Sequence, residues 1–122
     1  KRSDAMLEQL NSMNDRLGDP ESQREQQPGY AQNGTRSIKP DVLVLVGLCT
    51  HLSCSPKFRP AIQPEVFDEE WIGGFFCPCH GSKFDLAGRV YAGVPAPSNL
   101  EVPPHFYESD SVIVIGEDEG TA

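Results

Sequence analysis

Hydrophobic residues near the start of the chain recur three or four positions apart, which is the spacing of one face of an α-helix. Ser3 or Asp4 can cap the start of this helix, and Gly18 followed by Pro20 is typical of a helix end. The pattern therefore predicts one short amphipathic helix. Its apolar positions are Met6, Leu10, Met13 and Leu17.

The hydropathy pattern changes twice after this helix. Residues 19–39 are polar and rich in Gln, Asn, Gly and Ser, which predicts a long connection rather than a packed element. The run "VLVLVGL" at 42–48 is apolar, rich in β-branched residues and of strand length. We expect a buried strand there that ends at Cys49.

Further short strands are predicted in the second half of the chain. The segment "WIGGFF" at 71–76 places two glycines between apolar and aromatic residues, which is typical of a bent strand or tight hairpin leading to Cys77. The last two strand candidates, "LEVPPHFYE" and "SVIVIGE", are expected to form a hairpin around 108–110. The predicted fold class is mainly β, with one short helix.

Composition limits the size of the protein and the partners that suit it. The chain has 122 residues, 38% of them hydrophobic, which fits one small domain. Its 11 prolines and 11 glycines favour a loop-rich fold. The formal net charge of -8 disfavours binding to nucleic acid or to an anionic membrane surface, because the long-range field repels both. A basic partner would suit it.

Two six-residue boxes carry the candidate chemistry, "CTHLSC" at 49–54 and "CPCHGS" at 77–82. They contain all four cysteines and two of the three histidines of the chain. Thiolate and imidazole suit zinc, copper and iron–sulfur clusters, whereas hard ions prefer oxygen ligands. The boxes therefore predict a Cys/His metal site on two loops.

Two other interpretations of the boxes stay open on the residues alone. Four cysteines can form two structural disulfides in three connectivities, with the histidines merely nearby. A structural zinc ion is the second alternative, although zinc ligands usually come as Cys-x-x-Cys pairs and the first box has Cys-x-His. The third histidine, His105, lies outside the boxes, and we expect it at the surface or at a strand end rather than in the site.

The two boxes resemble the cluster-binding boxes of the Rieske iron–sulfur proteins, the electron-transfer subunits of cytochrome bc1 complexes. The resemblance extends from residue 42 to the end of the chain and includes 93–97, which is similar to the family's proline-rich loop. It implies a small antiparallel sheet sandwich with a cluster-binding subdomain and one short helix. The expected division is helix and polar connection (1–41), cluster-binding region (42–104), and closing hairpin with acidic tail (105–122).

The resemblance also implies a ligand set for a Rieske-type 2Fe-2S cluster, one per chain. Cys49 and Cys77 would bind one iron, and His51 and His80 the other. Neutral imidazoles in place of two thiolates remove negative charge from the cluster, which favours uptake of an electron. The remaining cysteine of each box would form a disulfide, which argues for an oxidising compartment. These two residues are Cys54 and Cys79.

Other residues gain expected roles from the same resemblance. Ser82 would donate a hydrogen bond to a cluster sulfur, and Phe84 stands where many high-potential relatives have a tyrosine that donates another. Leu52 would be an apolar docking surface, with an ordinary covering role as the equal alternative, and Pro95 lies in the proline-rich loop. Ser53 departs from the glycine that relatives usually carry, which affects local backbone geometry.

The implied function is electron transfer within a bacterial quinol–cytochrome c reductase. His80 would hydrogen-bond quinol, and the electron would pass to cytochrome c1, with cytochrome b and cytochrome c1 as partners. The chain would be a soluble fragment whose N-terminal membrane anchor lies before Lys1, on the periplasmic side of the inner membrane. The competing function is a soluble Rieske-type ferredoxin or an oxygenase domain, but such relatives generally lack the second cysteine pair. A zinc-stabilised binding module is the alternative from another class.

Overall fold

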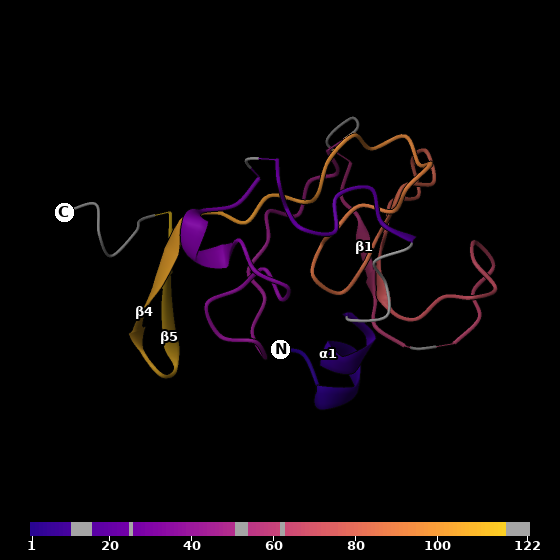
Figure 1. Ribbon diagram of the computed structural model, residues 1–122. Helices are drawn as coiled ribbons and strands as arrows, with labels where there is room; N and C mark the ends of the chain where they lie inside the picture. Colours follow the sequence, from indigo (N-terminus) through magenta and orange to yellow (C-terminus); the bar gives the residue numbers. More distant parts are fainter. Residues whose placement is uncertain (11–15, 25, 51–53, 62, 117–122) are drawn as a thin grey trace.

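The computed structural model describes residues 1–10, 16–24, 26–50, 54–61 and 63–116 (Figure 1). Two small antiparallel sheets and one short α-helix are connected by long irregular segments, which confirms the predicted mainly β class. The β4–β5 hairpin lies at one end of the molecule, away from α1 and β1. The elements are α1 (Asp4–Leu10), the 3-10 helix η2 (Gly29–Ala31), β1 (Lys57–Arg59), β2 (Gly74–Phe76), β3 (Lys83–Phe84), β4 (His105–Ser109) and β5 (Val112–Ile115).

The first sheet has the order β1-β2-β3 and leads directly into the second box. Phe75 pairs with Phe58 on one side and with Phe84 on the other. Gly73 and Gly74 have φ values of 90° and 143°, which L side chains rarely adopt. A Cβ at Gly74 would also overlap the carbonyl oxygen of Phe84. The predicted bent strand before the second box is therefore confirmed, and its bend requires glycine.

The second sheet is the predicted hairpin of β4 and β5. Its register pairs His105 with Ile115 and Tyr107 with Ile113, and it shifts before Ser109 and Val112 pair. His105 begins β4, as expected of a strand-end residue. Of the two expected positions, the strand end is therefore confirmed and the surface is not, because His105 is buried and its Nδ1 lies 2.8 Å from the carbonyl oxygen of Pro103.

The strand predicted at 42–48 is wrong: in the described part of the chain this run is irregular and half-buried or exposed. The amide of Val46 donates to the carbonyl oxygen of Glu101 at 2.8 Å, which is a single long-range backbone bond. The other backbone bonds donated from this run, by Val42 and Leu48, are local. A strand needs a partner along its length, and one bond does not supply it.

The predicted N-terminal helix is shorter than expected. Its start is confirmed, because the Ser3 Oγ accepts a hydrogen bond from the Met6 amide at 3.3 Å. Its predicted extent to Leu17 is wrong, because Leu17 forms an antiparallel bridge with Tyr91 and packs with Trp71. Leu17 therefore lies in an apolar cluster with Trp71 and Tyr91 rather than on the helix. Met13, another predicted apolar position, lies outside the described residues.

The connection at 19–39 packs closely against the rest of the molecule, contrary to the prediction. Ser22 and Arg36 are fully buried within it. The Arg36 guanidinium donates to the carbonyl oxygens of Ala87 and Gly88 at 3.1 and 3.2 Å. Such a side chain can satisfy several buried carbonyl groups at once, so a polar segment is able to cover the core.

The apolar core next to the boxes includes two of their cysteines. Cys49 and Cys77 pack with the rings and side chains of later segments, so the boxes are part of the core rather than appendages to it. The other members of this cluster are Phe84, Val90, Ala96 and Leu100. None of the helices in the described residues is long and apolar enough to span a membrane.

Candidate functional site

Each box is closed by a backbone hydrogen bond between its first and last residues. The amide of Cys49 donates to the carbonyl oxygen of Cys54 at 2.6 Å, and the amide of Cys77 donates to that of Ser82 at 2.8 Å. A second bond within the second box runs from the Gly81 amide to the Cys77 carbonyl oxygen at 3.0 Å. The two boxes are therefore closed loops of equal length, each with its first cysteine at the base.

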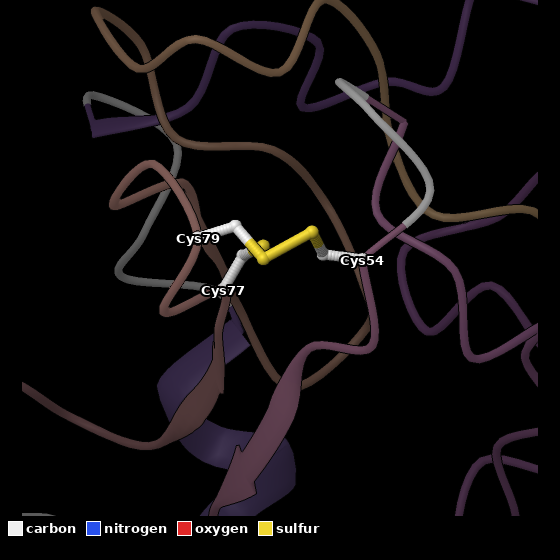
Figure 2. Close-up of side chains that lie close together, drawn as sticks. All are labelled: Cys54, Cys77 and Cys79. Carbon is white, nitrogen blue, oxygen red and sulfur yellow. A yellow bond between two sulfur atoms is a disulfide. The ribbon is translucent and has the colours of Figure 1, made fainter.

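A disulfide between Cys54 and Cys79 joins the two loops, with their Cα atoms 6.5 Å apart (Figure 2). This is the pairing that the resemblance implied. Cys49 and Cys77 take no part in a disulfide, so the alternative of two structural disulfides is wrong. The side chain of Cys77 lies against the bridge, and the three sulfur atoms of Cys54, Cys77 and Cys79 lie within 4.8 Å of one another.

The predicted cluster ligands that the structure describes differ in burial: the two cysteines are buried and the histidine is exposed. Cys49 and Cys77 are each 2% exposed, at the ends of the boxes that enter the core. His80 is exposed, four residues into the second box. His51 lies outside the described residues, as do Leu52 and Ser53. Two buried thiols and an exposed imidazole are donors that fit a cluster with thiolate ligands inside and imidazole ligands outside.

A third segment, the proline-rich loop and the residues that follow it, holds both boxes. The Ala96 amide donates to the Ser82 Oγ at 3.0 Å, which ties the loop to the second box. The Thr50 Oγ1 donates to the Ser98 carbonyl oxygen at 2.6 Å, which ties the same segment to the first box. Sequence reasoning missed Thr50 and Ser98, because a backbone acceptor has no signature in the sequence.

The two residues expected to tune the cluster, Ser82 of the second box and Phe84 of β3, are both buried. Ser82 accepts the bond from Ala96 through its oxygen, so its hydroxyl hydrogen is available for donation to another group. Phe84 is fully buried in the same apolar cluster as Cys49 and Cys77. Pro95 is exposed on the proline-rich loop. The roles of these residues toward a cluster stay predictions.

An ion-pair network anchors the strand that leaves the second box. Lys83 of β3 donates to Asp68 Oδ2 at 3.2 Å, and Arg16 donates to the same oxygen at 2.9 Å. Burial acts to raise the pKa of Asp68, but the hydrogen bond from the Glu70 amide and the two cations outweigh it, so this pKa is lowered. The Asp68 carboxylate therefore holds three segments together at neutral pH.

Buried charges fix the turn that follows β3. Asp85 accepts bonds from the amides of Ala87 and Arg89, and the Arg89 Nε donates to it at 2.7 Å. Burial raises the pKa of Asp85, and the charge and hydrogen bonds of Arg89 oppose that rise. Burial lowers the pKa of Arg36 to about 10, so Arg36 remains a cation at neutral pH. The turn behind Phe84 is thus rigidly held.

Comparison with known proteins places the boxes in a family. A model of the Rieske [2Fe-2S] domain matches residues 30–104. The ubiquinol-cytochrome c reductase iron-sulfur subunit of Allochromatium vinosum is 55% identical over 121 residues, which are 99% of this chain and 58% of that protein. The subunit of the same name from Rhodospirillum rubrum is 45% identical over 102 residues, 83% of this chain and 50% of that protein.

A mitochondrial protein is also similar to this chain. The Rieske subunit of the cytochrome b-c1 complex from Theropithecus gelada is 45% identical over 81 residues, which are 66% of this chain and 26% of that protein. The chain thus spans about half the length of the bacterial relatives that it matches. The family model covers both boxes and the proline-rich loop between residues 30 and 104. The chain belongs to the family of Rieske [2Fe-2S] domains.

Proposed function

We propose that this chain is the cluster-bearing part of the iron–sulfur subunit of a bacterial ubiquinol–cytochrome c reductase. In this role it takes an electron from quinol and passes it to cytochrome c1. One observation carries the proposal: two buried cysteines, Cys49 and Cys77, lie in two loops that the Cys54–Cys79 disulfide locks together. The names of the two bacterial relatives support the same reaction.

Four residues are proposed to hold the cofactor. Cys49 and Cys77 supply thiolates from the buried base, and His51 and His80 supply imidazoles. His80 does so from the exposed side of the second box. When bound, a Rieske [2Fe-2S] cluster carries one electron at a higher potential than a cluster with four thiolates. The closed boxes and the disulfide limit the motion of these ligands. The burial of Cys49 and Cys77 keeps water from the two cysteines.

His80 is proposed to contact the quinol. Its imidazole is exposed, whereas the cysteines of the site are buried, so a substrate can reach the site through this side chain. A ring nitrogen of His80 would accept a hydrogen bond from a quinol hydroxyl group and take up its proton as the electron leaves. The chain therefore supplies both an electron path and a proton acceptor.

The proposed partners are cytochrome b and cytochrome c1 of the same complex, on the periplasmic side of the inner membrane. The oxidising conditions of that compartment suit the disulfide between Cys54 and Cys79. The net charge of -8 suits a docking partner with a basic surface.

Absorption and electron paramagnetic resonance spectra test the proposal. The purified chain, reduced with dithionite without oxygen, should be coloured and give the signal of a reduced iron–sulfur cluster with one unpaired electron. A zinc-stabilised module would be colourless and without a signal, and that result would overturn the proposal. The match to the Rieske [2Fe-2S] domain model would then need an explanation other than a bound iron–sulfur cluster.

The quinol role of His80 is tested in the complete complex. His80→Gln should abolish reduction of cytochrome c1 by quinol, because the proposed proton acceptor and iron ligand is lost. His105→Gln is the matched control, since it makes the same change in β4, outside both boxes. Equal loss of activity in the two variants would contradict the proposal.

A further inference from the structure

Three of the four cysteine sulfurs meet at one point between the boxes (Figure 2). Cys77 and Cys79 come from the second box and Cys54 from the first, and their sulfur atoms all lie within 4.8 Å of one another. Cys77 is buried, Cys54 is half-buried and Cys79 is exposed, so the group opens toward solvent on one side. Cys49 belongs to the same apolar cluster as Cys77 but is not one of the three.

We propose that reduction of the Cys54–Cys79 disulfide converts these three residues into a site for a thiophilic divalent metal ion of the zinc type. This site shares Cys77 with the proposed cluster ligands, so the two metal centres exclude each other. The three-sulfur site rests on the sulfur positions alone, whereas its competition with the cluster rests on the proposed function.

The geometry is close to what such an ion needs. A tetrahedral zinc ion with Zn–S bonds of about 2.3 Å holds its sulfur ligands about 3.8 Å apart. The sulfurs of Cys54 and Cys79 move apart when their bond is broken, and both already lie beside Cys77. Shifts of about 1 Å in these side chains therefore suffice, with water as the fourth ligand.

The chemistry of the conversion balances with one added reagent. A dithiol supplies two electrons and two protons and is oxidised to its own disulfide, whereas a phosphine is oxidised to the phosphine oxide with water as the source of the oxygen and the two protons. In either case the Cys54–Cys79 bond is broken and two thiols are left. The ion then binds three thiolates, and three protons leave the thiols of Cys54, Cys77 and Cys79. No group is oxidised in the binding step.

The disulfide therefore has a second role besides holding the two loops together: it prevents the competing metal site from forming. While it is intact, Cys54 and Cys79 cannot ligate a metal, and the thiols that remain in the boxes are Cys49 and Cys77. A zinc ion would otherwise gain three thiolates at once and occupy Cys77. Oxidation of the pair thus removes the competing site and leaves the donor set to the cluster.

Cobalt(II) is a suitable probe of this site, because its absorption reports tetrahedral geometry and its charge-transfer band grows with the number of thiolate ligands. Iron-free protein, treated with a phosphine reductant, should bind one Co²⁺ per chain with an intense charge-transfer band, and Zn²⁺ should displace it. Iron-free protein with the disulfide intact keeps only the thiols of Cys49 and Cys77 in the boxes, so any charge-transfer band that it gives should be markedly weaker. An equal band in both forms would overturn the proposal.

Single variants identify the ligands. Cys54→Ser and Cys79→Ser should each lower the affinity of the reduced protein for Co²⁺ by about tenfold or more, because one of three metal–sulfur bonds is lost. Ser111→Ala in the β4–β5 turn, outside both boxes, is the control and should keep the affinity of the unsubstituted chain. Cys49→Ser tests whether the ion also uses a thiol outside the group of three sulfurs. If Cys49→Ser weakens binding as much as Cys54→Ser, the ion binds any available thiols and the proposed site is wrong.

The competition is tested separately, by adding iron and sulfide to reduced protein. Protein loaded with Zn²⁺ should form the iron–sulfur spectrum much more slowly than metal-free protein, and Cys54→Ser should remove most of this delay. An unsubstituted chain that never forms the spectrum would overturn the proposed function and, with it, the competition. A chain that forms the spectrum at the same rate with and without Zn²⁺ would overturn the competition alone.

Discussion

The amide of Cys77 donates a hydrogen bond to the carbonyl oxygen of Ser82 at 2.8 Å, which closes the second box on itself. Cys49 and Cys54 close the first box in the same way. In each loop the first cysteine is held at the buried base, and a disulfide joins the loops above it. This arrangement assigns different tasks to the two cysteine pairs, and substitutions can separate them.

Removal of a buried cysteine should abolish the cluster. Cys49→Ala and Cys77→Ala each remove one of four proposed ligands, which leaves iron open to water and loses binding energy that orders both loops. Iron and acid-labile sulfide per chain should fall to background in both variants. Full iron content in either one, with an unchanged absorption spectrum, would show that the substituted cysteine is not a ligand.

Removal of the disulfide should have a different effect. The double variant Cys54→Ser/Cys79→Ser should still assemble a cluster but release it faster, because the two loops are no longer tied together. Cys54 and Cys79 lie 25 residues apart in sequence. A disulfide that closes a loop of that size stabilises a fold by about 3 kcal/mol, so the free energy of unfolding should fall by about this amount in the double variant. Denaturant unfolding and the rate of iron release to a chelator measure the two effects. An unchanged release rate would contradict the clamping role.

Substitutions at Ser82 and at Phe84 should shift the reduction potential of the cluster in opposite directions. Reduction adds negative charge to the cluster, and hydrogen-bond donors to sulfur stabilise that charge. Ser82→Ala should lower the potential by removing a donor, and Phe84→Tyr should raise it by adding one. Redox titration at one pH measures both, with Phe106→Tyr in β4 as the control.

An unchanged or lower potential in Phe84→Tyr, with the cluster fully occupied, would show that an added hydroxyl at this buried position does not reach the sulfur. An equal rise in Phe106→Tyr would show that the shift does not depend on position.

Asp68 should make folding stability depend on acid pH. Its folded-state pKa is lowered, so it contributes stability above its unfolded pKa of about 4, and this contribution is lost as the pH falls through the folded value. Asp68→Asn should therefore lower the free energy of unfolding at pH 7 by about 1 kcal/mol. It should also reduce the difference between the free energies of unfolding at pH 7 and at acid pH. Urea unfolding at both pH values measures it. An undiminished difference in the variant would contradict the role of Asp68.

Local and covalent features of this fold were predictable from the sequence. The cysteine and histidine spacing predicted the two loops, and the resemblance supplied the Cys54–Cys79 pairing that the structure has. Paired glycines before Cys77 predicted the bend, because positive φ values are reserved largely for glycine. Short strand candidates and turn residues predicted the β4–β5 hairpin, whose strands are close in sequence.

Features that depend on distant partners were not predictable. The run 42–48 has strong β propensity, but the described structure gives it one long-range backbone bond. The polar segment 19–39 is packed because Arg36 reaches carbonyl oxygens about fifty residues away in sequence, at Ala87 and Gly88. The bond from Thr50 to Ser98 likewise joins a side chain to a backbone acceptor. None of these contacts leaves a periodic pattern.

The central claim is that two histidines and two cysteines, His51 and His80 with Cys49 and Cys77, hold one cluster. Pulsed electron paramagnetic resonance of the reduced chain, labelled with ¹⁵N in histidine alone, tests it most directly. We predict strong hyperfine coupling to two directly bonded histidine nitrogens, and loss of the cluster or of one coupling in His80→Cys. A cluster signal without any histidine nitrogen coupling would mean ligation by sulfur alone and would contradict the account.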